Sequence, residues 1–533
     1  MGNDPEAGEV VAGGELEAPL LQPATSGTTA DFRHSECTQA LKSNFWDCTT
    51  NLTKVILGAG IMALPRAVAL LGWGLGLSLL VVVGLLTHFT VHGLILASDR
   101  CRRDTYSSLV RTSLGPIPEK VLQGTLLLGC LGFEVVYIDI IGDLLLGDAP
   151  DYDGLITTWL PQEDKQAWWV GRQLVLAALT AGVLAPLASM RTMGGLGLVN
   201  LIGLGSLAGF AGATIWLAVA AIVSGRAYAL PLGPDLPALG STTAQQITGA
   251  LSVVPILLTA ASCHQSVHPL RAMLVPYSRP LLDKVVATSL TMVTALFVVV
   301  CLSAYTAFGP NVRGNFLNNL SPAELTPLIG ATAGNVVSLA IKAGYAVSLV
   351  GSAVLIMFPL RQSLLELVAP AAVLPGAPPV STRLYLSCTY GLLATVYGIA
   401  VYVPSIWDVI SFVGSVACTI MCFIIPAALL VMYVDQPTLA DRLQRACAWG
   451  VGLLGLGLFL NVFVGLYLSL TQPPAAKPSP PPGLGAAAVE GLEGAGVLAT
   501  AVHAWLWRAA GRAARAGADG CLKEVLRWAG WGA

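Results

Sequence analysis

The chain contains 533 residues, of which 55% are hydrophobic and only 11% are charged, and its mean hydropathy is +0.72. This balance excludes an ordinary soluble domain and indicates a polytopic membrane protein embedded in a lipid bilayer. The formal net charge of -2 gives no indication of a nucleic-acid partner.

The first 44 residues are polar and acidic, and they lack the apolar core of a secretory signal peptide. We therefore expect residues 1–44 to be a disordered cytosolic segment, followed by a transmembrane domain over residues 45–471. Glu15 and Glu17 stand before the pair Leu20-Leu21, in the manner of a dileucine peptide read by sorting adaptors. Short patterns of this kind also arise by chance. This one favours an endolysosomal or vacuolar membrane over the plasma membrane.

Windows long enough to cross about 30 Å of hydrocarbon predict about eleven transmembrane helices and an all-α fold. The helices are expected near residues 49–71, 73–97, 121–147, 169–189, 196–223, 247–270, 284–308, 333–359, 384–403, 407–434 and 449–470. The segment after the second span is rich in arginine, whereas the loop after the third is rich in aspartate and glutamate. By the positive-inside rule, the arginine-rich segment and the N-terminus are cytosolic.

The first span carries a weak point near its middle. Gly58, Gly60 and Pro65 fall together in an apolar stretch that is otherwise long enough to span lipid. Glycine is a poor helix former and proline withholds a backbone donor, so we expect a discontinuous helix. Secondary transporters use such half-helices to hold charged substrates and coupling ions. The alternative is that the glycines only let neighbouring helices pack closely.

Three acidic residues lie within the third span. Asp139 and Asp143 are four residues apart and should share a helical face, with Glu134 well off it. Ionisable groups at membrane depth usually mark a pathway, a proton relay or a paired charge. Asp139 and Asp143 are therefore candidates for a proton relay. The structural alternative is that these acids pair with a lysine or a histidine.

Polar residues gather in the sixth span. His264, Ser266, His268 and Pro269 are expected to interrupt this helix as the glycines interrupt the first. His264 and His268 are four residues apart, but no carboxylate or cysteine cluster with metal-ligand spacing accompanies them. We therefore predict no cofactor and no metal other than a coupling sodium ion. His264 is a further candidate for a proton-sensitive group.

The longest predicted outer loop, residues 309–332, contains the sequon Asn319-Leu320-Ser321, which predicts glycosylation at Asn319. Residues 472–495 are rich in Pro, Ala and Gly and are expected to be a linker. Residues 496–533 mix tryptophan with arginine and lysine, a composition typical of a basic interfacial amphipathic helix. A poorly ordered extension without function is the alternative for this tail.

Five motifs resemble, in the same order, those of the amino acid/auxin permease family, particularly its sodium-coupled neutral amino acid transporter branch. The motifs are Asn51-Leu52-Thr53-Lys54-Val55-Ile56-Leu57-Gly58-Ala59-Gly60-Ile61 with Leu64-Pro65; Ile140-Ile141-Gly142-Asp143; Cys263-His264 with Ser266-Val267 and Pro269; Phe358-Pro359-Leu360-Arg361 with Ser363-Leu364; and Val403-Pro404-Ser405-Ile406-Trp407-Asp408-Val409-Ile410-Ser411-Phe412-Val413-Gly414. The resemblance covers residues 44 to 470. It implies a LeuT-type architecture, in which spans one to five and six to ten form inverted repeats around a broken first and a broken sixth span.

The resemblance also implies a substrate site between the two breaks. Freed backbone amides would hold a carboxylate and freed carbonyls an ammonium group, and an amino acid presents both. The substrate-binding candidates are Gly58, Ala59, Gly60, Ile61, Cys263, His264 and Ser266. By alignment with the sodium-coupled branch, Asn51 and Ser352 are the coupling-ion candidates. Lys54 stands where that branch typically has a neutral residue, so its ammonium group could substitute for sodium or repel it, which leaves proton coupling or uniport open. The alternative is that Lys54 extends to the cytosolic interface from the start of the helix.

We interpret the chain as a secondary active transporter of neutral amino acids that works by alternating access with sodium or proton symport. The alternative is a transporter-like sensor that binds amino acids and signals with little net flux. An enzyme is not indicated, since the sequence shows no nucleophile and base pattern and no phosphate loop. The sequence does not predict the oligomeric state or the particular amino acid.

Overall fold

The computed structural model describes residues 44–58, 60–147, 152–161, 163–190, 197–370, 380–403, 405–434 and 438–471. Several predictions fall outside the described residues. They concern the N-terminal segment with its dileucine pair, Ala59, the linker over 472–495 and the tail over 496–533. These remain predictions.

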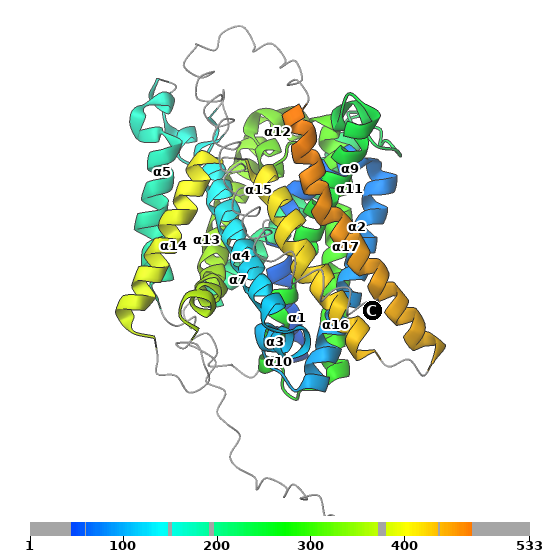
Figure 1. Cartoon of the computed structure of the whole chain (residues 1–533). Coiled ribbons are helices and arrows are strands. Elements are labelled where there is room, and N and C mark those ends of the chain that lie inside the picture. The colour runs from blue at the N-terminus through cyan, green and yellow to red at the C-terminus, as the bar shows by residue number, and fades with distance from the viewer. Residues whose placement is uncertain are drawn as a thin grey trace, which may run out of the picture.

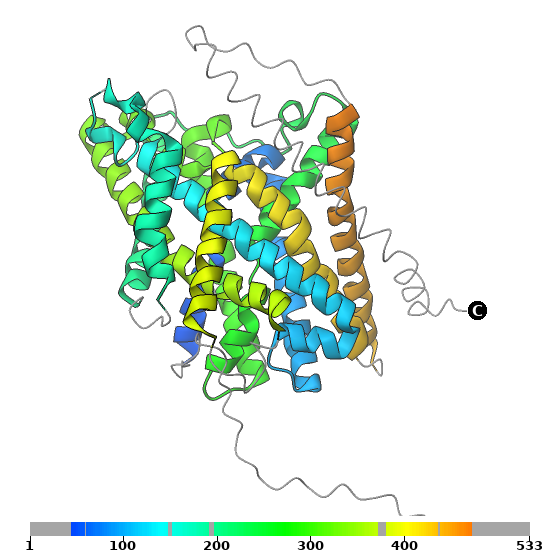
Figure 2. The same cartoon turned by 60° about the vertical axis from the view of Figure 1, so that its left-hand side comes forward.

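The described residues are almost entirely helical, and their long helices run side by side in one bundle (Figures 1 and 2). The longer elements are α1 (Phe45–Ile56), α2 (Gly60–Cys101), α4 (Pro116–Leu146), α5 (Arg172–Leu179), α7 (Gly197–Val223), α9 (Thr243–Ala261), α10 (His264–Met273), α11 (Arg279–Phe308), α13 (Ala331–Val368), α14 (Thr382–Tyr402), α15 (Ile406–Val413), the π-helix η8 (Gly414–Ile424), α16 (Ile425–Tyr433) and α17 (Leu439–Thr471). The connecting elements are α3 (Tyr106–Leu114), η1 (Thr157–Trp159), η2 (Asp164–Gln166), η3 (Trp168–Val170), η4 (Thr180–Leu184), α6 (Ala185–Ala188), α8 (Leu236–Leu239), η5 (Gly309–Asn311), η6 (Phe316–Asn319) and α12 (Pro322–Ile329).

Nine helices in the described part of the chain are long and apolar enough to cross a membrane. One of them, α2, contains two spans because Gly72 leaves the helical conformation (φ 74°, ψ 156°). Only glycine adopts this backbone without strain, and a Cβ there would lie 2.1 Å from the Gly233 carbonyl oxygen. The shorter apolar helix over Arg172–Ala188 adds the remaining span. Counted in this way, the structure confirms the predicted eleven spans.

The first span is discontinuous, as predicted. α1 begins at a capping box in which the Asp47 N–H donates to Asn44 Oδ1 at 2.9 Å and the Asn44 N–H donates to Asp47 Oδ2 at 3.3 Å. It ends at Ile56, and helix resumes as α2 at Gly60. The residues from 60 to the Gly72 kink therefore complete a span that α1 starts.

The sixth span is also broken, but not where the sequence predicted. α9 ends at Ala261 and α10 begins at His264, with Ser262 and Cys263 between them outside helical conformation. Ser262 is extended (φ -69°, ψ 126°), and its hydroxyl donates to the carbonyl of Thr259 at 2.9 Å. The polar residues of 264–269, proline included, belong to α10 itself. The break therefore precedes them, because extended backbone at Ser262 ends α9 before the proline is reached.

The broken helices lie next to each other. α2 packs against α9 and α11, α1 contacts α10, and α13 packs against α4 and α7. α3 and α10 lie at one end of the bundle and α12 at the other (Figure 1). The α3 end carries the arginines of the segment that the positive-inside rule predicts to be cytosolic.

Candidate functional site

Two tyrosine hydroxyls converge on the break between α1 and α2. Tyr345 of α13 donates its hydroxyl to the carbonyl of Gly58 at 3.4 Å. A Cβ at Gly58 would lie 2.8 Å from the hydroxyl oxygen of Tyr137 on α4. Sequence reasoning missed both tyrosines. A usable signal was present, because a tyrosine in the middle of an apolar span needs a hydrogen-bond partner for its hydroxyl.

The two breaks are in contact through Gly60. A Cβ at Gly60 would lie 2.7 Å from the Cα of Ala260, which stands two residues before Ser262. Ile61, the next residue of α2, is fully buried in the apolar core. Gly60 was expected to let a ligand approach the backbone. The structure shows that Gly60 lets α9 approach α2, as the packing alternative for this glycine requires, and its role in substrate binding stays a prediction.

The predicted residues of α10 face different neighbours. His264 is fully buried, and its Nε2 lies 2.9 Å from the hydroxyl of Thr90 on α2, while its Nδ1 has no hydrogen-bond partner. Cys263 is a buried free thiol at the break itself. Ser266 is half-buried, and its N–H donates to the Cys263 carbonyl at 2.9 Å. Of these residues, Cys263 lies closest along the chain to freed backbone, whereas the His264 ring points to α2.

The two coupling-ion candidates do not share a cavity. Ser352 lines a small cavity of about 20 Å³ together with Lys54, Gly58 and Ser348, whereas Asn51 is exposed and is not among its lining residues. A Cβ at Gly203 would lie 2.7 Å from the Ser348 hydroxyl oxygen and 3.5 Å from the Lys54 Nζ atom. The ammonium group of Lys54 therefore lies beside the hydroxyl groups that were expected to bind sodium.

Asp139 and Asp143 share a helical face, as predicted, and one arginine binds both. Arg172 donates from Nη2 to Asp139 Oδ1 at 3.2 Å and from Nη1 to Asp143 Oδ1 at 2.5 Å. Asn315 donates to the second oxygen of Asp143 at 3.0 Å. We call these four residues the Arg172 cluster. The partner of the acids is an arginine at the start of α5 and not the lysine or histidine that the structural alternative named.

The sequon asparagine is buried. Asn319 is 0% exposed; its Nδ2 donates to the carbonyl of Asn311 at 3.0 Å, and its Oδ1 accepts from the Arg313 N–H at 2.8 Å. A glycan needs the same nitrogen and open space around it. The prediction of glycosylation at Asn319 therefore does not fit this conformation of the loop.

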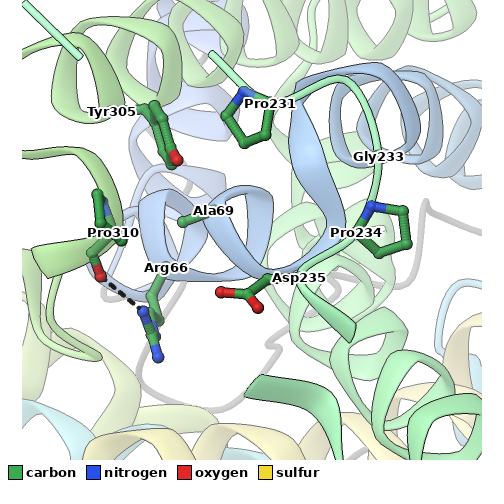
Figure 3. Close-up of a pocket in the computed structure, with 8 residues that line it drawn as sticks. All are labelled: Arg66, Ala69, Pro231, Gly233, Pro234, Asp235, Tyr305 and Pro310. Carbon is green, nitrogen blue, oxygen red and sulfur yellow. Dashed lines mark hydrogen bonds between the residues drawn. The ribbon is translucent and has the colours of Figure 1, made fainter. Parts of the chain in front are cut away.

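A larger cavity of about 210 Å³ lies beside the part of α2 between the break and Gly72 (Figure 3). Arg66, on the α2 segment after the break, donates from Nη1 to the carbonyl of Pro310 at 3.1 Å. Figure 3 shows the carboxylate of Asp235 extending toward the Arg66 side, with Tyr305 also lining the cavity. A guanidinium and a carboxylate across one cavity offer complementary charges to a zwitterion.

At the α3 end, an ion-pair network joins α10 to α2. Arg271 binds Asp99 at 2.9 Å and Asp104 at 3.0 Å, and the hydroxyl of Tyr277 donates to Asp99 at 2.7 Å. Burial, together with the hydrogen bond to Asp99, raises the pKa of Tyr277 to about 12. Tyr277 therefore stays a neutral donor at physiological pH, and the network ties the second half of the broken sixth span to α2.

A sequence model of the family described as transmembrane amino acid transporter protein matches residues 41–468. The chain is similar to amino acid transporter AVT6A of Arabidopsis thaliana, with 29% identity over 419 residues, which cover 78% of this chain and 86% of the relative. It is also similar to solute carrier family 38 member 10 of Mus musculus, with 24% identity over 448 residues, which cover 81% of this chain and 37% of that relative.

Among solved structures, MhsT in complex with L-phenylalanine resembles this chain with a TM-score of 0.53 and 14% sequence identity. The match covers 78% of this chain and 98% of MhsT. At this identity the likeness shows the fold alone. It confirms the expected LeuT-type architecture, to which the two broken helices belong.

Proposed function

Because the match over residues 41–468 shows that this chain belongs to the transmembrane amino acid transporter family, we propose that it is a secondary active transporter of neutral amino acids. It works by alternating access around the breaks in the first and sixth spans. The observation that carries this proposal is the contact between these breaks. α2 and α9 meet at Gly60 and Ala260, beside the freed backbone of both helices.

The groups at the breaks suit the two ends of an amino acid. Freed N–H groups and the Tyr137 hydroxyl can donate to a carboxylate, and freed carbonyls such as that of Gly58 can accept from an ammonium group. α10 starts without a side-chain cap, which leaves its first turn available to an anion. Lys54 borders the Gly58 cavity, so its positive charge opposes an amino acid with a cationic side chain.

Protons fit the coupling role better than sodium. A sodium site needs several oxygen ligands around an empty cavity, and the cavity beside Ser348 and Ser352 also has the Lys54 ammonium group in its wall. A fixed cation there supplies the positive charge that a bound sodium ion would bring and repels a second one. Sodium coupling through Asn51 and Ser352 is the alternative.

The proposal includes a cytosolic N-terminus and an endolysosomal or vacuolar membrane. The arginines near α3 support this orientation through the positive-inside rule, and the acidic dileucine pattern supports the location. A fluorescent fusion should leave internal membranes for the cell surface when Leu20→Ala and Leu21→Ala are combined. Identical surface localisation of both proteins contradicts the sorting role.

Reconstitution tests the transport function. Purified protein in proteoliposomes should accumulate a radiolabelled neutral amino acid when the outside is acidic, and should not do so when only a sodium gradient is imposed. Protein-free liposomes and a protonophore serve as controls. Saturable amino acid binding without flux under either gradient contradicts transport and indicates a sensor.

A further inference from the structure

One buried acid of α4 has no charge partner. Glu134 is 1% exposed, and its Oε2 atom makes no hydrogen bond. Among the described residues no cation forms a salt bridge with this carboxyl group, whereas Asp139 and Asp143 both pair with Arg172. The sequence singled out Glu134 as an acid at membrane depth, and neither the substrate site nor the Arg172 cluster uses it.

The other acids of α4 are all held by arginine. Glu119, near the start of the helix, pairs with Arg111 at 3.7 Å, and the two aspartates belong to the Arg172 cluster. Their negative charges are compensated in place. Glu134 is thus the exception on its helix: all three acids are buried, but only the two aspartates have an ion-pair partner.

Glu134 lies on the face of α4 that connects the two helix breaks. Helical spacing places it beside Tyr137, three residues on, and Cys130, four residues back. Tyr137 reaches the first break, as described above. Two residues before Glu134, Gly132 lies against Val413 of α15, and the next residue, Gly414, packs on Thr259 of α9, whose carbonyl accepts the Ser262 hydroxyl at the second break. Glu134 therefore stands on α4 between the residues that connect to each break.

The groups around this face cannot neutralise a carboxylate. They are the thiol of Cys130 and the hydroxyls of Tyr137 and Tyr345, which carry no positive charge. Lys54 borders the Gly58 cavity and forms no ion pair with Glu134. A buried carboxyl group without a cation or a donor is stable in its protonated, neutral form.

We propose that Glu134 carries the proton that is coupled to amino acid transport. An O–H bond forms at a carboxyl oxygen of Glu134 when the breaks open to the acidic side, where hydronium gives up the proton. While Glu134 is buried, as the structure shows it, the acid is neutral. When the breaks open to the opposite side, the O–H bond breaks and water takes the proton. This inference rests on the proposed proton-coupled transport and names its carrier.

Glu134→Gln tests the proposal in proteoliposomes, because glutamine imitates the protonated acid but cannot release a proton. A symporter that moves one proton per substrate accumulates substrate up to about tenfold per pH unit. We expect the wild type to accumulate a neutral amino acid under an imposed pH gradient and Glu134→Gln to reach only equal concentrations on both sides. Exchange of internal for external amino acid should persist in the variant and lose its pH dependence. Glu119→Gln, the same change at an arginine-paired acid of α4, should keep the accumulation.

Accumulation by Glu134→Gln at the wild-type level overturns the proposal. So does a variant that loses only uptake of lysine or arginine, because Glu134 would then bind a cationic side chain. Should Glu134→Gln fail to insert, Glu134→Asp keeps a carboxyl group and should accumulate substrate with a shifted pH midpoint; an unchanged midpoint overturns the proposal. Absence of any flux in the wild type contradicts the transport function instead, so the two failures are distinguishable.

Discussion

Loss of Arg172 should destabilise the described bundle strongly. Arg172→Ala leaves the carboxylates of Asp139 and Asp143 without their cation, and these side chains are 0% and 10% exposed. Removing one partner of a buried ion pair costs about 3–5 kcal/mol, and the partial exposure of Arg172 favours the lower end, about 3 kcal/mol. The free energy of unfolding in mixed micelles of detergent and SDS measures the loss.

Arg313→Ala is the matched control. Arg313 pairs with Glu324 at 3.7 Å, but these side chains are 43% and 40% exposed. An exposed pair of this kind contributes about 0–1 kcal/mol. Combining Arg172→Ala with Asp139→Asn and Asp143→Asn should restore most of the stability, because no buried charge then remains uncompensated. A loss for Arg172→Ala no larger than that for Arg313→Ala refutes the view that the arginine neutralises this site.

Three further predictions concern the transport cycle. Tyr137→Phe removes a hydroxyl next to Gly58 and should raise the half-saturation concentration for uptake about fivefold, the equivalent of about 1 kcal/mol. Tyr390→Phe, at an exposed tyrosine of α14, should leave this concentration unchanged. Equal half-saturation concentrations for the two variants contradict the site. Lys54→Ala should reduce uptake in sodium and in sodium-free buffer alike, and a wild type that needs sodium contradicts the role given to the ammonium group. Arg271→Ala should release α10 from α2 and increase labelling of the buried Cys263 thiol by a maleimide, and unchanged labelling shows that the network does not restrain α10.

The spans and the first break could be predicted because their causes are local. An apolar window has to match the thickness of the bilayer, and two glycines with a proline weaken any helix that contains them. The second break shows the limit of this reasoning. Proline and polar residues at 264–269 made that stretch conspicuous, but the chain leaves the helix earlier, at Ser262 and Cys263. A proline is tolerated within a helix when neighbouring groups satisfy the freed carbonyl, and a sequence does not state which neighbours are present.

Tertiary contacts also decide what the polar side chains do. Helical spacing correctly placed Asp139 and Asp143 on one face, yet their partner comes from α5. The tyrosines that meet at Gly58 come from α4 and α13, which are far apart in the sequence. Spacing within one helix cannot predict such contacts, because they depend on how separate helices pack.

The acids of α4 show how a contact changes a functional interpretation. In the sequence, Asp139 and Asp143 are proton-relay candidates because they are acids at membrane depth. In the structure, Arg172 compensates both charges, so protonating either acid would break an ion pair that stabilises the bundle. Glu134 has no such pair to lose, and burial favours its neutral form. A group that gains and releases a proton in each cycle must do so at low cost, and on α4 that condition is met by the acid that the fold leaves without a partner.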